Sequence, residues 1–599
     1  MEDYLDKQSL QSIVKHFFHQ LTDDCINQVI EAGELIQVNA GEIVIKQGAD
    51  TNDVYFLLFG RITVEIKNEY NEEFILNEIS RGEFFGEMSL LTGEPRGTTL
   101  ITTKESTLLK IKGDTFKKLL DKHPSIHRYL NTLLINRLKK ANQLNSKTAF
   151  QNICFLQLDE SPSVRNLLQS VKEKLSAESN FFFVTKESFS KSNALDINAK
   201  NANWTRKHKF INWVYNLNKD YHHIVYFCDE QDQTWTELCL SQADRIMLVG
   251  SKVLPGDLTK IEKDLFVRKN IASKIERNLI IAWEEGDTIA NTKNILENRP
   301  IKNTFHIRTG KEVDRLIRYI MGKSIKLVLG GGGAKGFAHL GVYKAMLELD
   351  IPVDFVGGTS VGAIMGGSIA FGWSYEEMKE AVYQALVAKN PLNDYHLPLV
   401  SLLKGKKLEY TIQKYFGDRQ IEDLVIPYYA IASNFTKSRI EILNDGPLSF
   451  AIRASISLPT ILPPAVKGNS LLVDGGLIDN LPFEYMASLA QGPIIGVDLS
   501  THKERTLDYD EIPNNFTLLK QKVFGKRKYK VPSLGQIIMG TMTIASEEKR
   551  RNNEKKFDVY IKPDVSKYGF LKWNNFETIL QIGYDTAFPI LQAWKEKHW

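Results

Sequence analysis

The chain has 599 residues, a formal net charge of +4, 43% hydrophobic residues and 25% charged residues. This length exceeds the size at which a single hydrophobic core stops growing, so we expect about three domains. The small net charge argues against a nucleic-acid binder, and no apolar run approaches the ~18 residues that would span a bilayer.

The start of the chain and its cysteines indicate a compartment. Residues 1–4 are acidic and lead into an amphipathic segment, unlike a basic and apolar signal sequence. The four cysteines show no paired spacing. A reducing, cytoplasmic location is therefore expected, for a protein that is soluble or peripheral at a membrane surface.

Residues 1–145 predict an antiparallel β-barrel with flanking helices. Apolar residues from Leu10 to Leu21 recur every three or four positions, as on one face of a helix. Short strand-like runs punctuated by glycines follow at residues 37–38, 42–46, 54–59, 62–66 and 107–111.

Residues 82–99 read GEFFGEMSLLTGEPRGTT and resemble the phosphate-binding cassette of cyclic-nucleotide-binding domains. A short helix opening near Glu87 would aim free N–H groups at a cyclic phosphate. Arg96 would neutralise the phosphate with a forked donor pair, and Glu87 would accept a hydrogen bond from the ribose 2′-OH. The residues assigned to this site are Gly86, Glu87, Met88, Ser89, Arg96, Gly97 and Thr98.

The expected ligand of this cassette is cAMP or cGMP, with the base undecided, acting as an allosteric ligand. The alternative is a domain of the same fold that has lost its ligand. In that case Glu87 and Arg96 would pair with each other on the surface.

A helix is predicted after residues 123–125, where an apolar stripe begins. Its members are Ile126, Leu130, Leu133, Leu134, Leu138, Ala141 and Leu144. The stripe either packs within the chain or pairs two chains as a homodimer.

Residues 146–315 predict a Rossmann-like α/β linking domain. Runs at 181–184, 223–228, 243–249 and 278–283 read as buried parallel strands that alternate with helices. No catalytic set and no metal-ligand spacing stands out in this part of the chain.

Three glycine-bearing motifs follow in the last domain, residues 316–599: GGGGAKG at 330–336, GTSVG at 358–362 and DGG at 474–476. Ser360 lies between an apolar strand-like run and a helix-compatible run. The flanking Gly358 and Gly362 therefore allow the sharp turn of a nucleophile elbow. Asp474 follows an apolar run and is placed to accept the Ser360 proton.

The four-glycine loop follows another predicted strand, so its amides can converge on a developing negative charge. The predicted oxyanion hole consists of Gly331, Gly332, Gly333 and Ala334. Nucleotide-phosphate binding is the weaker interpretation. The loop does not fit GxxxxGK[ST], and Asp354 matches the acidic residue of a dinucleotide site only loosely.

Each motif alone has another interpretation, because GxSxG occurs by chance and Asp-Gly often caps turns. Their order and strand context together favour a serine hydrolase with a Ser/Asp dyad. His502 follows Asp474 past a further predicted strand, so a Ser-Asp-His triad is the alternative.

These motifs, together with AIRASISLP at 451–459 and the prolines at 463–464, resemble the patatin-like phospholipases. With the upstream nucleotide-type domain and the tail at 559–584, the chain is similar to their neuropathy target esterase branch. The resemblance implies an α/β hydrolase with a mainly parallel sheet and the dyad Ser360 and Asp474. It also implies an acyl-enzyme intermediate, no catalytic cofactor, and phospholipid or lysophospholipid substrates.

Two other classes of function remain open. One is a cyclic-nucleotide sensor that binds lipid without turnover. The other is a transcription regulator, which is disfavoured because no helix-turn-helix follows the barrel helix.

A basic stretch in the tail fits an anionic membrane surface, or else forms a solvated loop. Lys520, Lys522, Lys526, Arg527, Lys528 and Lys530 interleave there with Val523, Phe524 and Tyr529.

Overall fold

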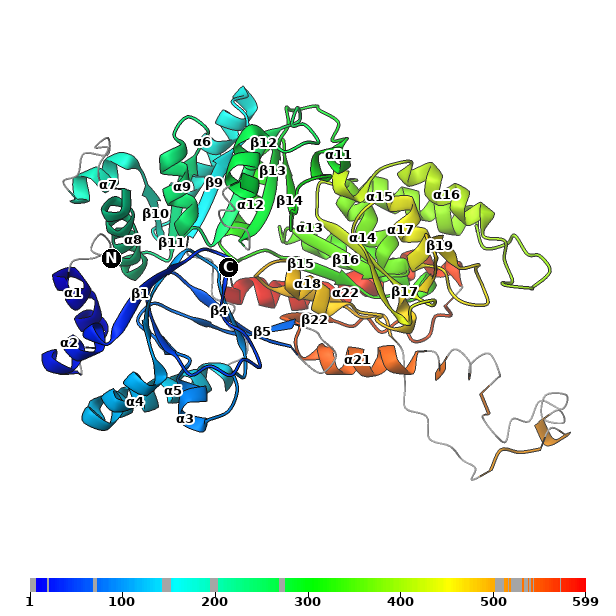
Figure 1. Cartoon of the computed structure of the whole chain (residues 1–599). Coiled ribbons are helices and arrows are strands. Elements are labelled where there is room, and N and C mark those ends of the chain that lie inside the picture. Colours follow the sequence, from blue (N-terminus) through cyan, green and yellow to red (C-terminus); the bar gives the residue numbers. More distant parts are fainter. Residues whose placement is uncertain are drawn as a thin grey trace. The chain divides into compact units, whose positions relative to one another are not determined.

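Two sets of residues form separate units in this computed structural model (Figure 1). Unit 1 contains residues 1–282 and 298–302, and unit 2 contains residues 283–297 and 303–599. The predicted domain boundaries after residues 145 and 315 stay predictions. The structure describes residues 7–18, 21–67, 73–142, 152–193, 203–268, 275–500, 511–514, 516–518, 531–532, 537, 540–541, 543–570 and 572–598.

The N-terminal part of unit 1 contains two four-stranded antiparallel sheets, with strand orders β1-β8-β3-β6 and β2-β7-β4-β5. Leu57 and Leu108 from the first sheet share one core with Ile62 and Leu100 from the second. The predicted barrel is therefore two packed sheets. The strands are β1 (Gly33–Val38), β2 (Ile43–Ile45), β3 (Val54–Phe59), β4 (Ile62–Lys67), β5 (Glu73–Ile79), β6 (Phe84–Phe85), β7 (Thr99–Thr102) and β8 (Ser106–Ile111).

Helices pack against one face of the first sheet. The helices are α1 (Lys7–Phe17), α2 (Asp23–Glu31), α3 (Glu87–Thr92), α4 (Gly113–Lys122) and α5 (Pro124–Asn142). Val14 of α1 and Ile126 and Leu130 of α5 are buried in one cluster with Phe56 of β3. The first half of the predicted α5 stripe thus packs within the chain. The side chains of Leu138, Ala141 and Leu144 lie outside the described residues, and the homodimer stays a prediction.

The second part of unit 1 has a parallel sheet in the order β10-β11-β9-β12-β13. Its strands are β9 (Asn152–Gln157), β10 (Phe181–Val184), β11 (His223–Cys228), β12 (Arg245–Ser251) and β13 (Glu276–Ala282). The four predicted strands are present, and the central β9 was not predicted. The helices are α6 (Pro162–Ser176), α7 (Lys186–Asn193), α8 (Asn203–Asp220), α9 (Gln233–Gln242) and α10 (Lys260–Glu262), followed by a π-helix (Lys263–Arg268).

Unit 2 is built on a mainly parallel sheet in the order β19-β20-β17-β16-β15-β21-β22, with β18 also pairing β17. Its strands are β15 (Lys326–Leu329), β16 (Phe355–Thr359), β17 (Tyr428–Asn434), β18 (Arg439–Leu443), β19 (Ala465–Lys467), β20 (Ser470–Asp474), β21 (Ile494–Val497) and β22 (Val559–Ile561). Another short strand of this unit is β14 (Thr304–Ile307).

Helices flank this sheet (Figure 1), and several of them contribute side chains to its core, among them Leu340, Ile369 and Leu580. They are α11 (Thr292–Leu296), α12 (Gly310–Ile320), α13 (Phe337–Glu348), α14 (Val361–Phe371), α15 (Tyr375–Val382), α16 (Lys406–Phe416), α17 (Leu448–Ser455), α18 (Phe483–Leu489), α21 (Ile544–Glu554) and α22 (Phe576–His598). Short helical turns are η2 (Gly333–Gly336), η3 (Tyr383–Ala388), η4 (Ile421–Asp423), η5 (Gly475–Leu477) and η6 (Trp573–Asn575). Among the helices that the structure describes, none has the length and apolar character to cross a bilayer.

Asp354, just before β16, anchors α12 to the sheet. Its buried carboxylate accepts hydrogen bonds from the Arg318 guanidinium, at 2.6 and 2.9 Å, and from the Ile325 N–H at 2.8 Å. The sequence had offered this residue as a loose match to a dinucleotide site. Its hydrogen bonds show a structural anchor.

The helices α13 and α22 approach each other through two glycines. A Cβ atom added at Gly341 would lie 2.0 Å from the Leu580 carbonyl oxygen, and one at Gly583 would lie 2.1 Å from the Ala338 carbonyl oxygen. Backbone atoms cannot move aside as a flexible side chain can. The two helices can therefore pack at this separation only where both positions lack a side chain.

We expect Gly583→Ala to destabilise unit 2 by about 1–3 kcal/mol, because the added methyl group overpacks the contact with α13. Urea unfolding followed by circular dichroism measures this change. Gly310→Ala is the matched control, because a Cβ at Gly310 meets nothing within 4 Å. The control should be neutral, or more stable by up to about 1 kcal/mol. Equal effects of the two substitutions would contradict the packing argument.

Candidate active site

Ser360 occupies the turn between β16 and α14 with backbone angles φ 56° and ψ −123°. A positive φ is uncommon for a residue with a side chain, so surrounding contacts must hold this conformation. The Ser360 N–H donates to Ser455 Oγ at 2.9 Å, and Ser455 Oγ–H donates to the Ile431 carbonyl at 2.6 Å. The turn is thus tied to the neighbouring strand β17.

The glycines on either side of Ser360 let β15 lie against this turn. A Cβ atom at Gly358 would be 2.6 Å from the Leu329 carbonyl oxygen, and one at Gly362 would be 2.1 Å from the same oxygen. Both distances are shorter than van der Waals contact allows. The spacing GxSxG therefore meets a steric requirement of this turn.

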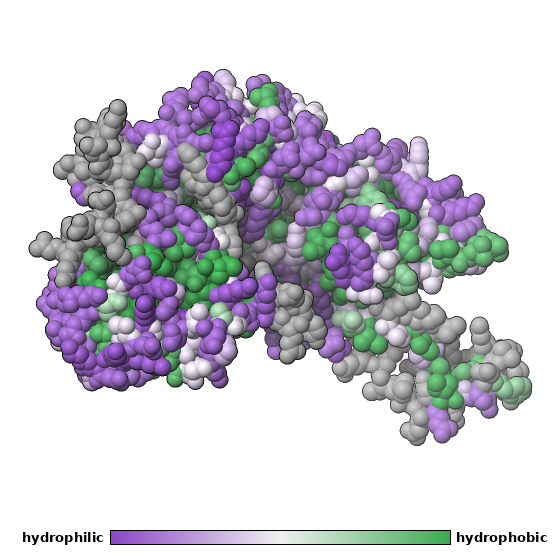
Figure 2. All heavy atoms as spheres, in the orientation of Figure 1, coloured by the Kyte–Doolittle hydropathy of each residue, from purple (hydrophilic) through white to green (hydrophobic). Residues whose placement is uncertain are grey.

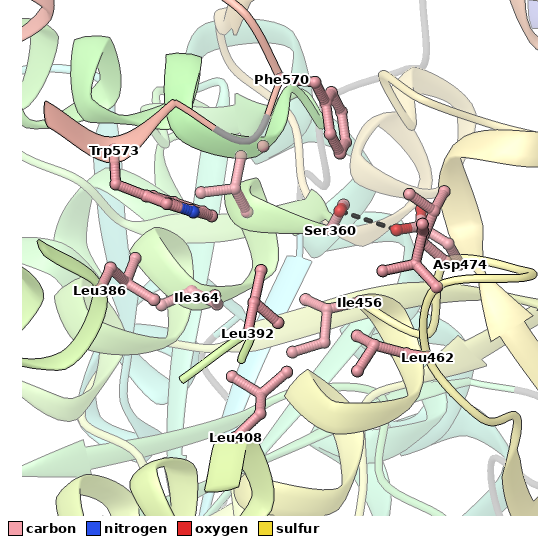
Figure 3. Close-up of a pocket in the computed structure, with 14 residues that line it drawn as sticks. Ser360, Ile364, Leu386, Leu392, Leu408, Ile456, Leu462, Asp474, Phe570 and Trp573 are labelled. Atoms are coloured by element: carbon pink, nitrogen blue, oxygen red, sulfur yellow. Dashed lines mark hydrogen bonds between the residues drawn. The ribbon is translucent and has the colours of Figure 1, made fainter. Parts of the chain in front are cut away.

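Ser360 and Asp474 lie together although they are 114 residues apart in the chain. Ser360 Oγ–H donates to Asp474 Oδ2 at 2.8 Å (Figure 3). The other carboxylate oxygen, Oδ1, accepts the Gly476 N–H at 2.8 Å. Burial raises the pKa of Asp474 to about 6, although both hydrogen bonds act in the opposite direction.

The glycine loop lies beside Ser360. A Cβ at Gly331 would be 3.1 Å from the Ser360 Cβ. Two of the four amides predicted for the oxyanion hole already have acceptors: the Gly331 N–H donates to the Asn480 carbonyl at 3.3 Å, and the Ala334 N–H to the Phe570 carbonyl at 2.8 Å. Within the described part of the chain, the N–H groups of Gly332 and Gly333 have no protein acceptor. The available donors are therefore these two.

Three side chains that the sequence did not single out as site residues support this geometry. Ser455 holds the Ser360 amide, and the Asn480 side-chain amide donates to the Gly331 carbonyl at 3.3 Å. His339 Nε2–H donates to the Gly330 carbonyl at 2.8 Å, and burial lowers the pKa of the ring to about 4. Ser455 lies in the segment 451–459, which resembles the patatin-like phospholipases. Of the three side chains, it is therefore the one that the sequence could have indicated.

Two predictions from the sequence concern residues that the structure does not describe. His502, the alternative base, and the basic stretch at 520–530 both lie outside the described residues. No group of three or more His, Cys, Asp or Glu side chains within the described ranges is arranged to hold a metal ion.

An apolar pocket opens at the Ser360 hydroxyl (Figure 3). Apart from Gly333, Ser360 and Asp474, its lining is apolar: Val361, Ile364, Leu386, Leu392, Leu408, Ile456, Leu458, Ile461, Leu462, Phe570 and Trp573. A second apolar cavity shares Ile364, Leu386 and Leu408 with it and continues to Trp373 and Phe416. The linings of the two cavities adjoin at these shared residues, and we call the combined lining the apolar path.

A wider and more polar cavity of about 1110 Å³ also reaches Ser360 and Asp474. Gly332, Lys335, Asn480, Ser500 and Lys567 belong to its lining. The dyad therefore lies where an apolar pocket meets a polar cavity.

In the predicted phosphate-binding cassette at residues 82–99, Arg96 and Glu87 are both buried and have different hydrogen-bond partners. Arg96 donates to the carbonyls of Gly86 and Asp53, each at 2.7 Å, and to Thr51 Oγ1 at 2.9 Å. Glu87 Oε1 accepts from Arg137 of α5 at 2.8 Å. The surface pair of Glu87 and Arg96, expected for a domain without ligand, is therefore wrong, because Arg96 donates to two backbone carbonyls and Thr51 and Glu87 accepts from Arg137. The loss of the ligand itself stays an open alternative.

The other residues assigned to the cassette surround these two. Gly86 precedes α3 with φ 82°, and a Cβ there would be 2.9 Å from Arg96 Nη1. Met88 is exposed and Ser89 is buried on α3, while Gly97 and Thr98 lead into β7. The short helix that the sequence predicts near Glu87 is present as α3.

Comparison with known families gives three consecutive matches. Residues 35–123 match the cyclic nucleotide-binding domain, residues 167–326 match the neuropathy target esterase family P-loop like domain, and residues 327–487 match the patatin-like phospholipases.

Similar proteins align over nearly the whole chain. Rat patatin-like phospholipase domain-containing protein 7 is 26% identical over 97% of this chain, and lysophospholipase NTE1 of Pyricularia oryzae is 27% identical over 99%. Neuropathy target esterase sws of Drosophila melanogaster is 27% identical over 93%. The chain spans less than half the length of these relatives: 47%, 45% and 42%.

The serine turn, the buried aspartate and the family match define the class of this part of the chain: residues 327–487 form a patatin-like phospholipase domain. The other two matches narrow the assignment: residues 35–123 form a cyclic-nucleotide-binding-like domain, and residues 167–326 match a domain of the neuropathy target esterase family. Together with the relatives that align over nearly the whole of this chain, they make it similar to the neuropathy target esterase branch.

Because burial raises the pKa of Asp474, this carboxylate should cost the protein stability at neutral pH. The unfolded carboxyl titrates near 3.8 and the folded one near 6, so wild type should lose stability as pH rises through this window. We expect Asp474→Asn to be more stable than wild type above about pH 6, by about 1–3 kcal/mol, and to lack this pH dependence. Urea unfolding between pH 4 and 8 tests this, and a less stable variant at pH 8 would contradict it.

Proposed function

We propose that this protein is a serine esterase that hydrolyses acyl esters of phospholipids or lysophospholipids. The observation that carries the proposal is the 2.8 Å hydrogen bond from Ser360 to a buried aspartate with a pKa of about 6. Such a carboxylate is ionised at neutral pH and is basic enough to take a proton from the serine. A nucleophile with its base in hydrogen-bond contact is the basic unit of covalent acyl transfer.

In the proposed mechanism, Asp474 accepts the Ser360 proton as Oγ attacks the ester carbonyl. The N–H groups of Gly332 and Gly333 stabilise the oxyanion, assisted by the N-terminus of α14 at Ser360. Protonated Asp474 then returns the proton to the leaving alcohol, and an acyl-enzyme remains. Water, deprotonated by Asp474, attacks the acyl-enzyme, and Asp474 returns this proton to Ser360 Oγ as the fatty acid leaves.

The two cavities support a lipid substrate. The apolar path from Ser360 suits an acyl chain, because it removes hydrocarbon from water. Lys335 and Lys567 line the polar cavity and suit an anionic head group on the alcohol side of the ester. The names of the similar proteins, phospholipase and lysophospholipase, agree with this substrate class.

We expect Ser360→Ala and Asp474→Asn each to lower kcat on lysophospholipid by about two to four powers of ten, because each removes a participant in proton transfer. Wild-type kcat/KM should rise with pH through about 6, as Asp474 ionises. Ser488→Ala, an exposed serine of α18, is the control and should keep full activity. A Ser360→Ala protein with wild-type turnover would end the proposal.

The alternative from the sequence is a sensor that binds lipid without turnover. A fluorophosphonate probe discriminates the two functions, because it reacts with an activated serine and not with an ordinary hydroxyl. Labelling of wild type that Ser360→Ala abolishes supports the esterase.

We also propose a cyclic nucleotide as an allosteric ligand of the cassette. The family match to residues 35–123 and the buried Arg96 support it. A cyclic phosphate would replace the Gly86 and Asp53 carbonyls on Arg96, and a ribose hydroxyl would compete with Arg137 for Glu87. Because Arg137 belongs to α5, such a ligand would release the contact between α3 and α5 and favour a second state.

We expect cAMP or cGMP to raise the unfolding free energy of unit 1, by about 2.7 kcal/mol at one hundred times Kd. The same ligand should change the rate of ester hydrolysis. Arg96→Ala should abolish both responses, whereas Lys172→Ala, on the exposed face of α6, should keep them. If both nucleotides leave thermal stability and hydrolysis unchanged, the regulatory proposal fails.

A further inference from the structure

The segment between η3 and α16 forms a projecting loop with a closed base. Tyr395 and Leu403 form an antiparallel bridge, and the His396 N–H donates to the Leu402 carbonyl at 3.2 Å. The Lys404 N–H donates to the Asp394 carbonyl at 2.9 Å. Residues 396–402 are therefore the tip of an ordered hairpin-like loop, which projects beside α16 (Figure 1).

The side chains at this tip are apolar and lie in solvent. Leu397 is 73% exposed, Leu399 84% and Val400 67%. The space-filling view shows apolar surface at this end of unit 2, beside α16 (Figure 2). A single exposed leucine needs no explanation. A continuous run of exposed apolar side chains on an ordered loop tip indicates a surface that contacts a membrane or another protein.

The loop is connected to the apolar pocket at Ser360. The Leu402 N–H donates to the Thr460 carbonyl at 2.7 Å, and the Leu403 N–H to the Ile461 carbonyl at 3.0 Å. Ile461 lines the pocket, as does Leu392 just before the loop. Hydrocarbon around the tip would therefore lie next to the residues that line the apolar path.

Positive charge borders the apolar tip. Lys404, Lys406 and Lys407 are exposed where the chain leaves the loop and begins α16, and the exposed Tyr410 follows one turn later. Two carboxylates lie close by in the sequence: Glu409 is paired with Arg453 at 3.0 Å, and Asp394 Oδ2 accepts the backbone N–H of Lys407, so three lysines face one carboxylate that has no cationic partner. Lysines and an aromatic ring beside an apolar patch fit the polar boundary of a lipid bilayer.

We propose that residues 396–402 insert into the surface of an anionic lipid bilayer, with Lys404, Lys406 and Lys407 on the lipid head groups. A second copy of the chain fits less well, because a two-fold contact through this tip would bring the same lysines together. Anionic head groups complement them. The delivery of a substrate ester from the bilayer to Ser360 rests on the proposed function, whereas the docking itself does not.

Vesicle co-sedimentation of the full chain tests the docking. Leu399→Asp with Val400→Asp should weaken partition into phosphatidylcholine–phosphatidylserine vesicles at least about tenfold, because two exposed apolar side chains no longer enter the bilayer. Val253→Asp is the matched control, because Val253 is 73% exposed in unit 1, and it should bind as wild type does. Lys406→Glu with Lys407→Glu should remove the preference for phosphatidylserine over phosphatidylcholine alone.

Three further measurements separate docking from catalysis. The tip variant should hydrolyse a monomeric short-chain ester with wild-type kcat/KM and should keep wild-type circular dichroism. Ser360→Ala should bind vesicles as wild type does. If no ester is hydrolysed while vesicle binding depends on the tip, the proposed function fails and the docking stands.

Two results would overturn the docking proposal. One is wild-type partition of the tip variant into vesicles. The other is a change of oligomeric state in sedimentation velocity with unchanged vesicle binding, which would assign the tip to a contact between copies of the chain.

Discussion

The hydrogen bond between Ser360 and Asp474 depends on one strand that contributes neither residue. In β17, Ile431 lies opposite Thr359 of the parallel strand β16, and the next residue, Ala432, lies opposite Asp474 of the antiparallel strand β20. Sheet register therefore brings the end of β16 and the end of β20 side by side. The same strand accepts a hydrogen bond from Ser455, which in turn holds the Ser360 amide.

Burial raises the pKa of Asp474 and so makes the carboxylate that binds Ser360 a stronger base. Asp474 has two hydrogen-bond donors, Ser360 and Gly476, and among the described residues no lysine or arginine pairs with it. A carboxylate paired with a cation would hold its negative charge too well to act as a base. The neutral surroundings are thus a condition of the proposed proton transfer. The apolar pocket maintains them on one side, and the polar cavity admits water on the other.

The sequence predicted the parts of the site that depend on short stretches of chain. Glycines around Ser360 and the apolar run before Asp474 are local signals for a turn and a strand end. The partners of the glycine loop could not be predicted, because Asn480 and Phe570 reach it from distant parts of the chain. The sequence therefore assigned four amides to the oxyanion hole, whereas two of the four already donate to carbonyl groups of the protein.

Elsewhere, prediction failed where a pattern was short or where a backbone group was the partner. The strand β9 reads NICFLQ, which mixes polar and apolar residues and shows no period, although it lies at the centre of its sheet and all its residues except Gln157 are buried. For Arg96, the sequence offered a phosphate or Glu87 as partner. Nothing in a sequence marks the carbonyls of Gly86 and Asp53, which are the groups that the guanidinium binds.

The C-terminal segment contacts the glycine loop and the helix that follows it. The Phe570 carbonyl accepts the Ala334 amide, and α22 packs on α13 at glycine contacts. A nonsense codon shortly before residue 570 would therefore leave the three glycine-bearing motifs intact. The shortened protein would nevertheless lack the Phe570 carbonyl, which binds the glycine loop, and the helix α22, which packs on α13. A gene survey that scores only these motifs would still count it as an enzyme.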